Sequence, residues 1–227
     1  TQWNLFGQLV ILMLIQIGGL GIVTLATFFF FLLGKKVSMK GKVLAQESIS
    51  NYSLREVVVM LKYIMGITLL IEFAGAILLS TSFVPRFGLK GFYLAIFHSI
   101  SAFCNAGFDL MGGYRSLTQF NNDPVVIYTI GMLIVMGGLG FIVWKDLFDF
   151  RKKRYLYLHS KMVLIITASL IIFGAAFFFV SEQSNPLTMG PLNLFEKINA
   201  AVFHSITCRT AGYNTLSIND MNDLSKF

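Results

Sequence analysis

Long runs of hydrophobic residues alternate with short polar segments along this chain. A helix needs about 20 apolar residues to cross the hydrocarbon core of a bilayer. Four runs are close to that length or longer, at residues 6–33, 63–83, 124–144 and 162–180. Two shorter apolar stretches lie at residues 91–103 and 194–208. They are too short to span, so we predict four membrane-spanning helices and two short helices that are re-entrant, interfacial or buried.

Basic residues are concentrated in two of the connections between these runs. Residues 35–62 and 145–161 hold six Lys and Arg residues each, 12 of the 18 in the chain. The two connections that carry the short apolar stretches hold three each. Because Lys and Arg favour the cytoplasmic side of membrane proteins, we predict that residues 35–62 and 145–161 are cytoplasmic loops. The short stretches then enter the membrane from outside.

The composition is typical of a membrane protein. Hydrophobic residues make up 56% of the 227 residues and charged residues 13%, against about 45–50% and about 25% in soluble domains. The net charge of +7 comes largely from the two basic loops, so we expect a lipid environment and no nucleic-acid partner. The two Cys residues provide neither a disulfide framework nor the spacing of a metal site.

Two sequence patterns are repeated. AIFHSISAFCNAGFD (95–109) and AVFHSITCRTAGYNT (201–215) share Phe-His-Ser-Ile and then Ala-Gly-aromatic. QIGGLGIV (16–23) and VMGGLGFI (135–142) share Gly-Gly-Leu-Gly. The repeating unit is therefore an outward span, a dipping segment, and an inward span that ends in Gly-Gly-Leu-Gly. Only the middle unit is complete, and we expect the chain to be part of a longer polypeptide.

These repeats divide the chain into five predicted segments. They are the inner span of a first unit (1–34), a cytoplasmic loop (35–62), a complete second unit (63–144), a second cytoplasmic loop (145–161), and the outer span, short helix and filter of a third unit (162–227). The fold class that follows is an all-α integral membrane protein.

Gly107 and Gly212 follow the helical part of each repeated segment. Glycine adopts positive φ at little cost, so the chain can leave the helix and turn successive carbonyl oxygens toward one axis. Rings of carbonyl oxygens replace the hydration shell of K⁺ in selectivity filters, and the negative end of a short helix favours a cation. We therefore predict a pore helix and a filter strand in each copy. The alternative is a helix C-cap or a tight turn.

The filter segments NAGF (105–108) and TAGY (210–213), with ISAFCNAGFD, RTAGYNT and IQIGGLG, resemble the Trk/Ktr/HKT superfamily of potassium transport proteins. Three of these motifs, ISAFCNAGFD, RTAGYNT and IQIGGLG, closely resemble the bacterial Ktr-type membrane subunit, and the resemblance covers essentially the whole chain. It implies four units in pseudo-fourfold symmetry around one gated pore that takes up K⁺ across the cell membrane without chemical catalysis. It also implies a homodimer and a cytoplasmic nucleotide-binding regulatory subunit of the RCK type. The first and fourth filters are absent from this sequence.

The expected ion-binding residues follow from the two filter segments. They act mainly through backbone carbonyls and are Asn105, Ala106, Gly107, Phe108, Thr210, Ala211, Gly212 and Tyr213. Asp109 and its counterpart Asn214 are placed at the pore mouth, where a carboxylate raises the local cation concentration. A solvated cap is an equal alternative for Asp109. K⁺ is the only metal ion expected, as the transported ion, with no covalently bound cofactor.

Four further features each have two interpretations. For His98 and His204, a buried structural hydrogen bond is favoured over a metal or haem ligand. Glu72 lies within a predicted span, where a structural contact with the pore helix is favoured over a functional ionisable group. Arg209 is expected to turn away from the pore axis and bond the loop. The Gly-Gly-Leu-Gly glycines are expected to allow close packing rather than helix bending.

Three other functions stay open. A Na⁺-permeable or Na⁺-coupled relative would have the same fold. An intramembrane metal or haem enzyme subunit would use the two repeated histidines and the cysteines, and its bound group would show in an absorption spectrum. A scaffold subunit without a pore would give no ion flux after reconstitution.

Overall fold

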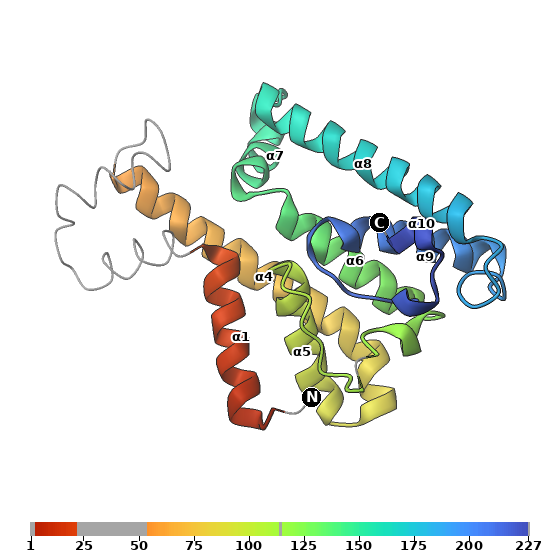
Figure 1. The fold of residues 1–227 in the computed structure, drawn as a ribbon. Coiled ribbons are helices and arrows are strands. Elements are labelled where there is room, and N and C mark those ends of the chain that lie inside the picture. The colour runs from red at the N-terminus through yellow and green to blue at the C-terminus, as the bar shows by residue number, and fades with distance from the viewer. Residues whose placement is uncertain (1–2, 22–53, 114, 227) are drawn as a thin grey trace.

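A computed structural model describes residues 3–21, 54–113 and 115–226, with side chains from residue 62 onward in the second range. All regular structure in these residues is helical (Figure 1), which confirms the predicted all-α fold. The helices are α1 (Leu5–Leu20), α4 (Leu54–Phe87), α5 (Lys90–Phe103), α6 (Pro124–Gly138), α7 (Phe141–Lys153), α8 (Leu158–Glu182), α9 (Leu194–Thr210) and α10 (Asp223–Lys226), with short 3₁₀ helices at Thr118–Phe120 and Ile218–Asp220. Residues 22–33 of the first apolar run and residues 35–53 of the first basic loop lie outside the described residues.

Two described helices are long and apolar enough to cross a membrane: the Lys62–Phe87 part of α4, and α8. They contain the second and fourth apolar runs. The described part of the first run is α1, which is apolar and has 16 residues. The third run differs from a single straight span, because it forms α6 and α7, which meet at an angle of 96°.

The bend between α6 and α7 lies at Gly140. This residue has a φ of 85°, a left-handed conformation that glycine adopts without the steric cost of a Cβ atom. The equivalent Gly21 directly after α1 has a φ of 81°, so both Gly-Gly-Leu-Gly sequences end their helix in the same way. The Trp144 indole N–H donates to the Met136 carbonyl across the bend, at 3.0 Å. The bending that the sequence analysis ranked second is therefore present in the structure.

The favoured interpretation of these glycines was close packing. It holds for one glycine in each Gly-Gly-Leu-Gly sequence, Gly19 and Gly137. A Cβ atom on Gly19 would overlap Cys104, and one on Gly137 would overlap the Phe103 carbonyl. Both contacts are with the C-terminal end of α5. The neighbouring Gly138 has no atom within 4 Å of the position of a Cβ atom.

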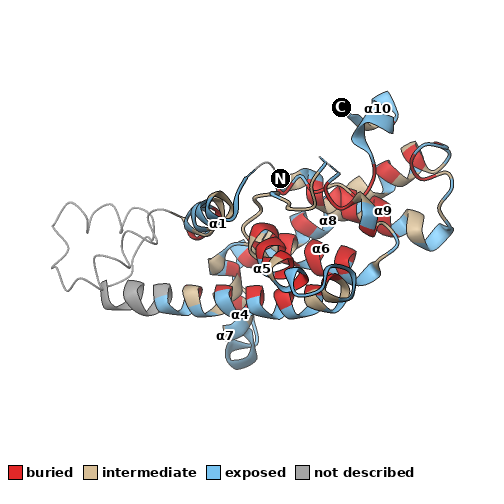
Figure 2. Ribbon diagram, turned by 90° about the horizontal axis from the view of Figure 1, so that it is seen from below, coloured by how far each residue is buried: buried red, intermediate tan, exposed pale blue. Residues whose placement is uncertain are grey.

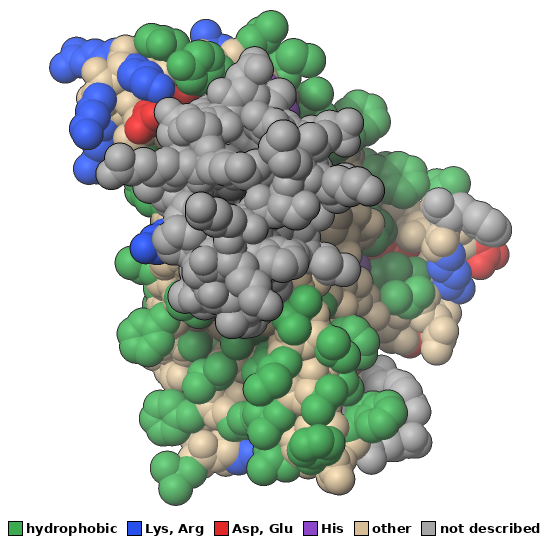
Figure 3. All heavy atoms as spheres, turned by 90° about the vertical axis from the view of Figure 1, so that its left-hand side faces the viewer, with side chains coloured by type: hydrophobic (Ala, Val, Ile, Leu, Met, Phe, Trp, Pro, Cys, Tyr) green, Lys and Arg blue, Asp and Glu red, His purple; other side chains and the backbone are tan. Residues whose placement is uncertain are grey.

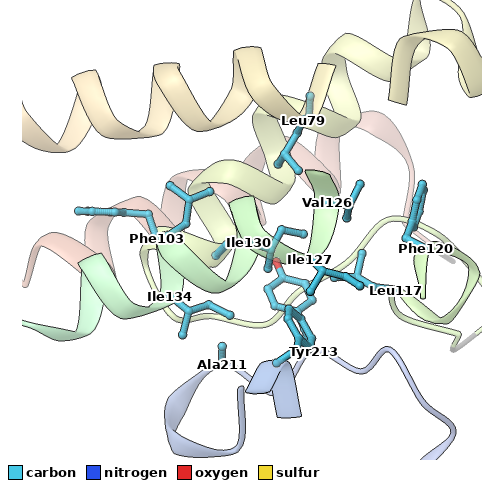
Figure 4. Close-up of a cluster of buried hydrophobic side chains, with 14 of the residues drawn as sticks. Leu79, Phe103, Leu117, Phe120, Val126, Ile127, Ile130, Ile134, Ala211 and Tyr213 are labelled. Atoms are coloured by element: carbon cyan, nitrogen blue, oxygen red, sulfur yellow. The ribbon is translucent and has the colours of Figure 1, made fainter. Parts of the chain in front are cut away.

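The two predicted short helices, α5 and α9, lie among the longer ones. α5 packs on α4, α9 packs on α8, and α6 contacts both α5 and α9. Figure 2 shows buried residues gathered on α5, α6 and α9. The main hydrophobic cluster includes Ala211 and Tyr213, the residues on either side of Gly212, and Figure 4 shows their side chains against α6 and the Leu117 loop. The second short helix and the chain after it are thus part of the core.

Large hydrophobic side chains are exposed on α1, α4 and α8. Figure 3 shows many of them on the face that includes α1, with Lys and Arg gathered near the top of the view. In α8 only 6% of the most apolar stretch is buried. Apolar surface of this extent is typical of helices that face lipid or other membrane helices. The chain is an integral membrane protein.

Candidate functional site: two re-entrant segments

The chain reverses direction directly after α5. The N–H of Ala106 donates to the Ser101 carbonyl at 2.9 Å, and the Ser101 hydroxyl donates to the Phe108 carbonyl at 2.8 Å. The N–H of Leu110 donates to Nε2 of His98 at 3.4 Å. Ala106 and Phe108 thus contact Ser101, and the later Leu110 contacts the earlier His98. The chain therefore runs back along α5 in the opposite direction.

The same reversal follows α9. The N–H groups of Ala211 and Gly212 donate to the Thr207 carbonyl, at 3.0 and 3.1 Å. The N–H of Leu216 donates to Nε2 of His204 at 3.3 Å. Each repeated segment is therefore a short helix followed by an irregular segment that runs back along it. After their predicted role, we call residues 105–108 filter segment A and residues 210–213 filter segment B.

Positive φ angles produce both reversals. Asn105, Gly107 and Gly212 have φ of 53°, 69° and 78°. The two glycines differ in their surroundings: a Cβ atom on Gly107 would overlap the carbonyl of Ala211, whereas no atom lies within 4 Å of a Cβ position on Gly212. Filter segment A therefore needs glycine both for its backbone conformation and for its contact with filter segment B.

Two side-chain hydrogen bonds join the filter segments, between residues 105 positions apart in the sequence. The Thr210 hydroxyl donates to Oδ1 of Asn105 at 2.8 Å. The Tyr213 hydroxyl donates to the Phe108 carbonyl at 3.0 Å. The Tyr213 side chain is fully buried. These bonds fix the two segments relative to each other.

The residues predicted at the pore mouth also contact the backbone. Oδ1 of Asp109 accepts a hydrogen bond from the Met111 N–H at 3.0 Å, which is the local cap that the sequence left as an alternative. The N–H of Asn214 donates to the Ser116 hydroxyl at 3.0 Å, and its carbonyl accepts from the Leu117 N–H at 2.9 Å. The loop after filter segment A thus holds the chain after filter segment B.

Most carbonyl oxygens of the predicted ion-binding residues accept no hydrogen bond from the described residues. They are the carbonyls of Asn105, Ala106, Gly107, Thr210, Ala211, Gly212 and Tyr213. Phe108 is different, because its carbonyl accepts from two hydroxyls. Backbone carbonyls without a donor are costly inside a membrane. Hard oxygen atoms of this kind are the ligands that replace water around K⁺ in known filters.

Glu72 joins three helices at the C-terminal end of α5. Its Oε1 accepts from the side-chain N–H of Gln16 in α1 at 3.0 Å, and from the thiol of Cys104 at 3.8 Å. Its backbone carbonyl accepts from the Ser99 hydroxyl at 2.6 Å. The Glu72 side chain is buried. These contacts are the structural role that the sequence analysis favoured.

Both repeated histidines are buried and make hydrogen bonds, as the structural interpretation expected. Among the described residues, no group of three or more His, Cys, Asp and Glu residues could hold a metal ion. Cys104 and Cys208 are free thiols. The Arg209 side chain makes no hydrogen bond or ion pair with any described residue, so its expected contact with the loop is not found there.

The sequence analysis did not single out Ser101 and Ser116, which hold the filter segments by hydrogen bonds. A signal for Ser101 exists, because the repeat places Thr207, another hydroxyl residue, at the same position. Ser116 lies outside the two repeated segments that the sequence analysis compared. Only the fold brings it to filter segment B.

Residues 1–227 match the family model described as TrkH, cation transport protein. The chain is 38% identical over 222 residues to potassium/sodium uptake protein NtpJ of Enterococcus hirae, covering 97% of this chain and 49% of the relative. It is 38% identical over 224 residues to Ktr system potassium uptake protein B of Bacillus subtilis, covering 98% and 50%. The Vibrio alginolyticus protein of the same name is 37% identical over 220 residues, covering 96% and 48%. The chain thus spans about half the length of these curated relatives.

Proposed function

The chain belongs to the TrkH family of cation transport proteins, and from this premise we propose that the whole protein takes up K⁺ through a gated, channel-like pore. In this proposal the chain contributes two strands of the selectivity filter. The observation that carries the proposal is the set of seven filter carbonyls that accept no hydrogen bond from the described residues. Three relatives whose names designate potassium uptake support the choice of ion.

The proposed mechanism is selection by backbone oxygens and passage without chemical change. α5 and α9 both end where the filter segments begin, so the partial negative charge of each helix C-terminus favours a cation at that place. The carbonyls of the filter segments then replace water around the ion. The Phe108 carbonyl contributes less to ion binding than the neighbouring carbonyls, because it accepts hydrogen bonds from two hydroxyls.

We further propose the orientation and assembly of the protein. The loops at residues 35–62 and 145–161 face the cytoplasm of a cell membrane, and K⁺ enters the filter from outside. The exposed basic residues 151–154 at the end of α7 support this orientation. The full pore is a pseudo-fourfold arrangement of four units in each protomer of a homodimer, regulated by a cytoplasmic nucleotide-binding subunit of the RCK type. Two relatives are named as part of a "Ktr system", which supports a transporter of several components.

Uptake by the full-length protein in liposomes tests this proposal. The change is Gly107→Ser, which adds a Cβ atom at a positive φ and against the Ala211 carbonyl. We expect the ratio of K⁺ to Na⁺ uptake to fall by roughly tenfold, since left-handed strain alone costs about 1–2 kcal/mol for a residue with a Cβ atom. The matched control is Gly66→Ser in α4, where no atom lies within 4 Å of the added Cβ position.

The same experiment examines the alternatives. An unchanged ratio in the folded Gly107→Ser protein would contradict the filter assignment. Wild-type uptake of Na⁺ equal to that of K⁺ would favour the Na⁺-permeable alternative, which has support in a relative named for both potassium and sodium uptake. Absence of any flux would favour the scaffold.

A further inference from the structure

We infer that His98 and His204 are positioning residues that fix the outer ends of the two filter segments and thereby the spacing of the ion-binding carbonyls. This inference rests on the proposed K⁺-selective filter. Each histidine lies within a short helix, and each Nε2 accepts the backbone N–H of the residue 12 positions later. The two contacts are equivalent in the two copies of the repeat.

The hydrogen bonds of His98 determine how its imidazole is protonated. Nε2 accepts from the Leu110 N–H at 3.4 Å, so this nitrogen carries no proton. The proton of the neutral ring is then on Nδ1, which lies 2.7 Å from the Leu94 carbonyl and donates to it. The ring is therefore a rigid link with one nitrogen tied to α5 and the other to the returning chain.

His204 makes the equivalent Nε2 contact with the returning chain after α9. Its Nε2 lies 3.3 Å from the Leu216 N–H and 3.3 Å from the Thr215 hydroxyl. The side chain is 2% exposed, and that of His98 is 0% exposed. Neither ring therefore has water as an alternative partner. Loss of the link would leave the N–H of Leu216 buried, and that of Leu110 partly buried, without an acceptor.

Aromatic contacts hold both rings in place. The His98 ring lies 5.6 Å from that of Phe83 in α4 and 6.4 Å from that of Tyr213 in filter segment B. The His204 ring lies 5.8 Å from that of Phe178 in α8. Each histidine thus connects a membrane-spanning helix to the chain that leaves the filter.

The links lie close enough to the filter to set its geometry. Leu110 is two residues beyond filter segment A, and Leu216 is three residues beyond filter segment B. At the other end, the Ala106 and Gly212 N–H groups are bonded to the preceding helices. Each filter segment is therefore held at both ends, and ion choice depends on how closely such carbonyls keep their places. Loss of the outer link would loosen the carbonyls without removing any of them.

The test uses the full-length protein and two substitutions of matched polarity. Gln can place its amide oxygen near the position of Nε2, whereas Asn is one carbon shorter and reaches only the position of Nδ1. We expect His98→Asn and His204→Asn to lower the ratio of K⁺ to Na⁺ uptake by about fivefold, the factor for one neutral hydrogen bond. The corresponding Gln variants should stay within about twofold of wild type. His159→Asn, on the exposed N-terminal turn of α8, is the control.

Hydrogen exchange measured by mass spectrometry gives a readout that does not depend on transport. Peptides that contain Leu110 or Leu216 should exchange faster in the matching Asn variant and at the wild-type rate in the Gln variant. Peptides from α4 and α8 should be unchanged, which shows that the protein is folded. Equal exchange and equal uptake ratios in the Asn and Gln variants would overturn the inference. If wild type shows no K⁺ uptake, the proposed function fails, and hydrogen exchange alone decides whether the histidines hold the segments.

Discussion

Gly107 and Gly212 occupy equivalent positions in the repeat but have different surroundings. Both have positive φ, so each would be strained by any side chain. Only Gly107 also touches the opposite filter segment, at the Ala211 carbonyl. The repeated backbone conformation therefore explains why glycine occurs in both copies. The contact of Gly107 with the Ala211 carbonyl explains why a substitution in filter segment A should disturb the carbonyls of both segments.

The Phe108 carbonyl is held by two hydroxyls, those of Ser101 and Tyr213. We expect Tyr213→Phe or Ser101→Ala alone to lower the ratio of K⁺ to Na⁺ uptake by no more than about twofold, because one donor remains. The double variant should lower it by more than the product of the single effects, since the carbonyl then has no donor and is free to turn. Uptake by the four proteins in liposomes measures this. If the effect of the double variant equals the product of the two single effects, neither hydroxyl compensates for loss of the other.

The sequence could predict the two short helices and the turns that follow them because their signal is local. A glycine after a short helical run, present in two copies, is visible within 15 letters of each copy. The bonds between the segments were not predicted, because they join residues 105 positions apart. No periodicity encodes which hydroxyl meets which carbonyl across such a distance. Ser116, which holds Asn214 at a separation of 98 positions, is a further case.

At the scale of helices, hydropathy located every apolar element within the described residues but missed one break. The predicted stretches at residues 91–103 and 194–208 correspond to α5 (Lys90–Phe103) and α9 (Leu194–Thr210). The run at residues 124–144 is continuous in hydropathy and yet divides at Gly140. Hydropathy measures the transfer of side chains to lipid and is insensitive to backbone angles. The Gly-Leu-Gly pattern was the signal for the break.

The bend gives a prediction of its own. Gly140→Ala places a Cβ atom at a φ of 85°, so the variant should shift toward a continuous helix through α6 and α7. Spin labels at Met132→Cys and Lys152→Cys in a cysteine-free protein should then move apart, toward the separation of about 30 Å along the axis of a straight helix. Gly138→Ala is the control, because Gly138 is helical and has open space around it. Equal distances in the two variants would show that Gly140 does not determine the bend.

At the scale of the whole molecule, the sequence repeat appears as a repeated contact. In one copy Gly75 of α4 allows the close approach of Ser99 in α5, and in the other Gly174 of α8 allows that of Ser205 in α9. Both hydroxyls donate to a carbonyl of the longer helix, at Glu72 and at Ile171. Each short helix is therefore held on its span by the same contact. The two short helices, α5 and α9, both contact α6, and the filter segments that follow them meet there.

The proposed orientation gives the last prediction. Lys152, among the basic residues at the end of α7, should lie in the cytoplasm, and Leu187, which is 71% exposed after α8, should lie outside. In a cysteine-free full-length protein, a membrane-impermeant maleimide should label Leu187→Cys in intact cells and Lys152→Cys only after permeabilisation. The replaced residues are Cys104 and Cys208, so K⁺ uptake by the cysteine-free protein is the control for a native fold. Labelling of Lys152→Cys in intact cells would reverse the orientation, and K⁺ would then enter the filter segments from the cytoplasm.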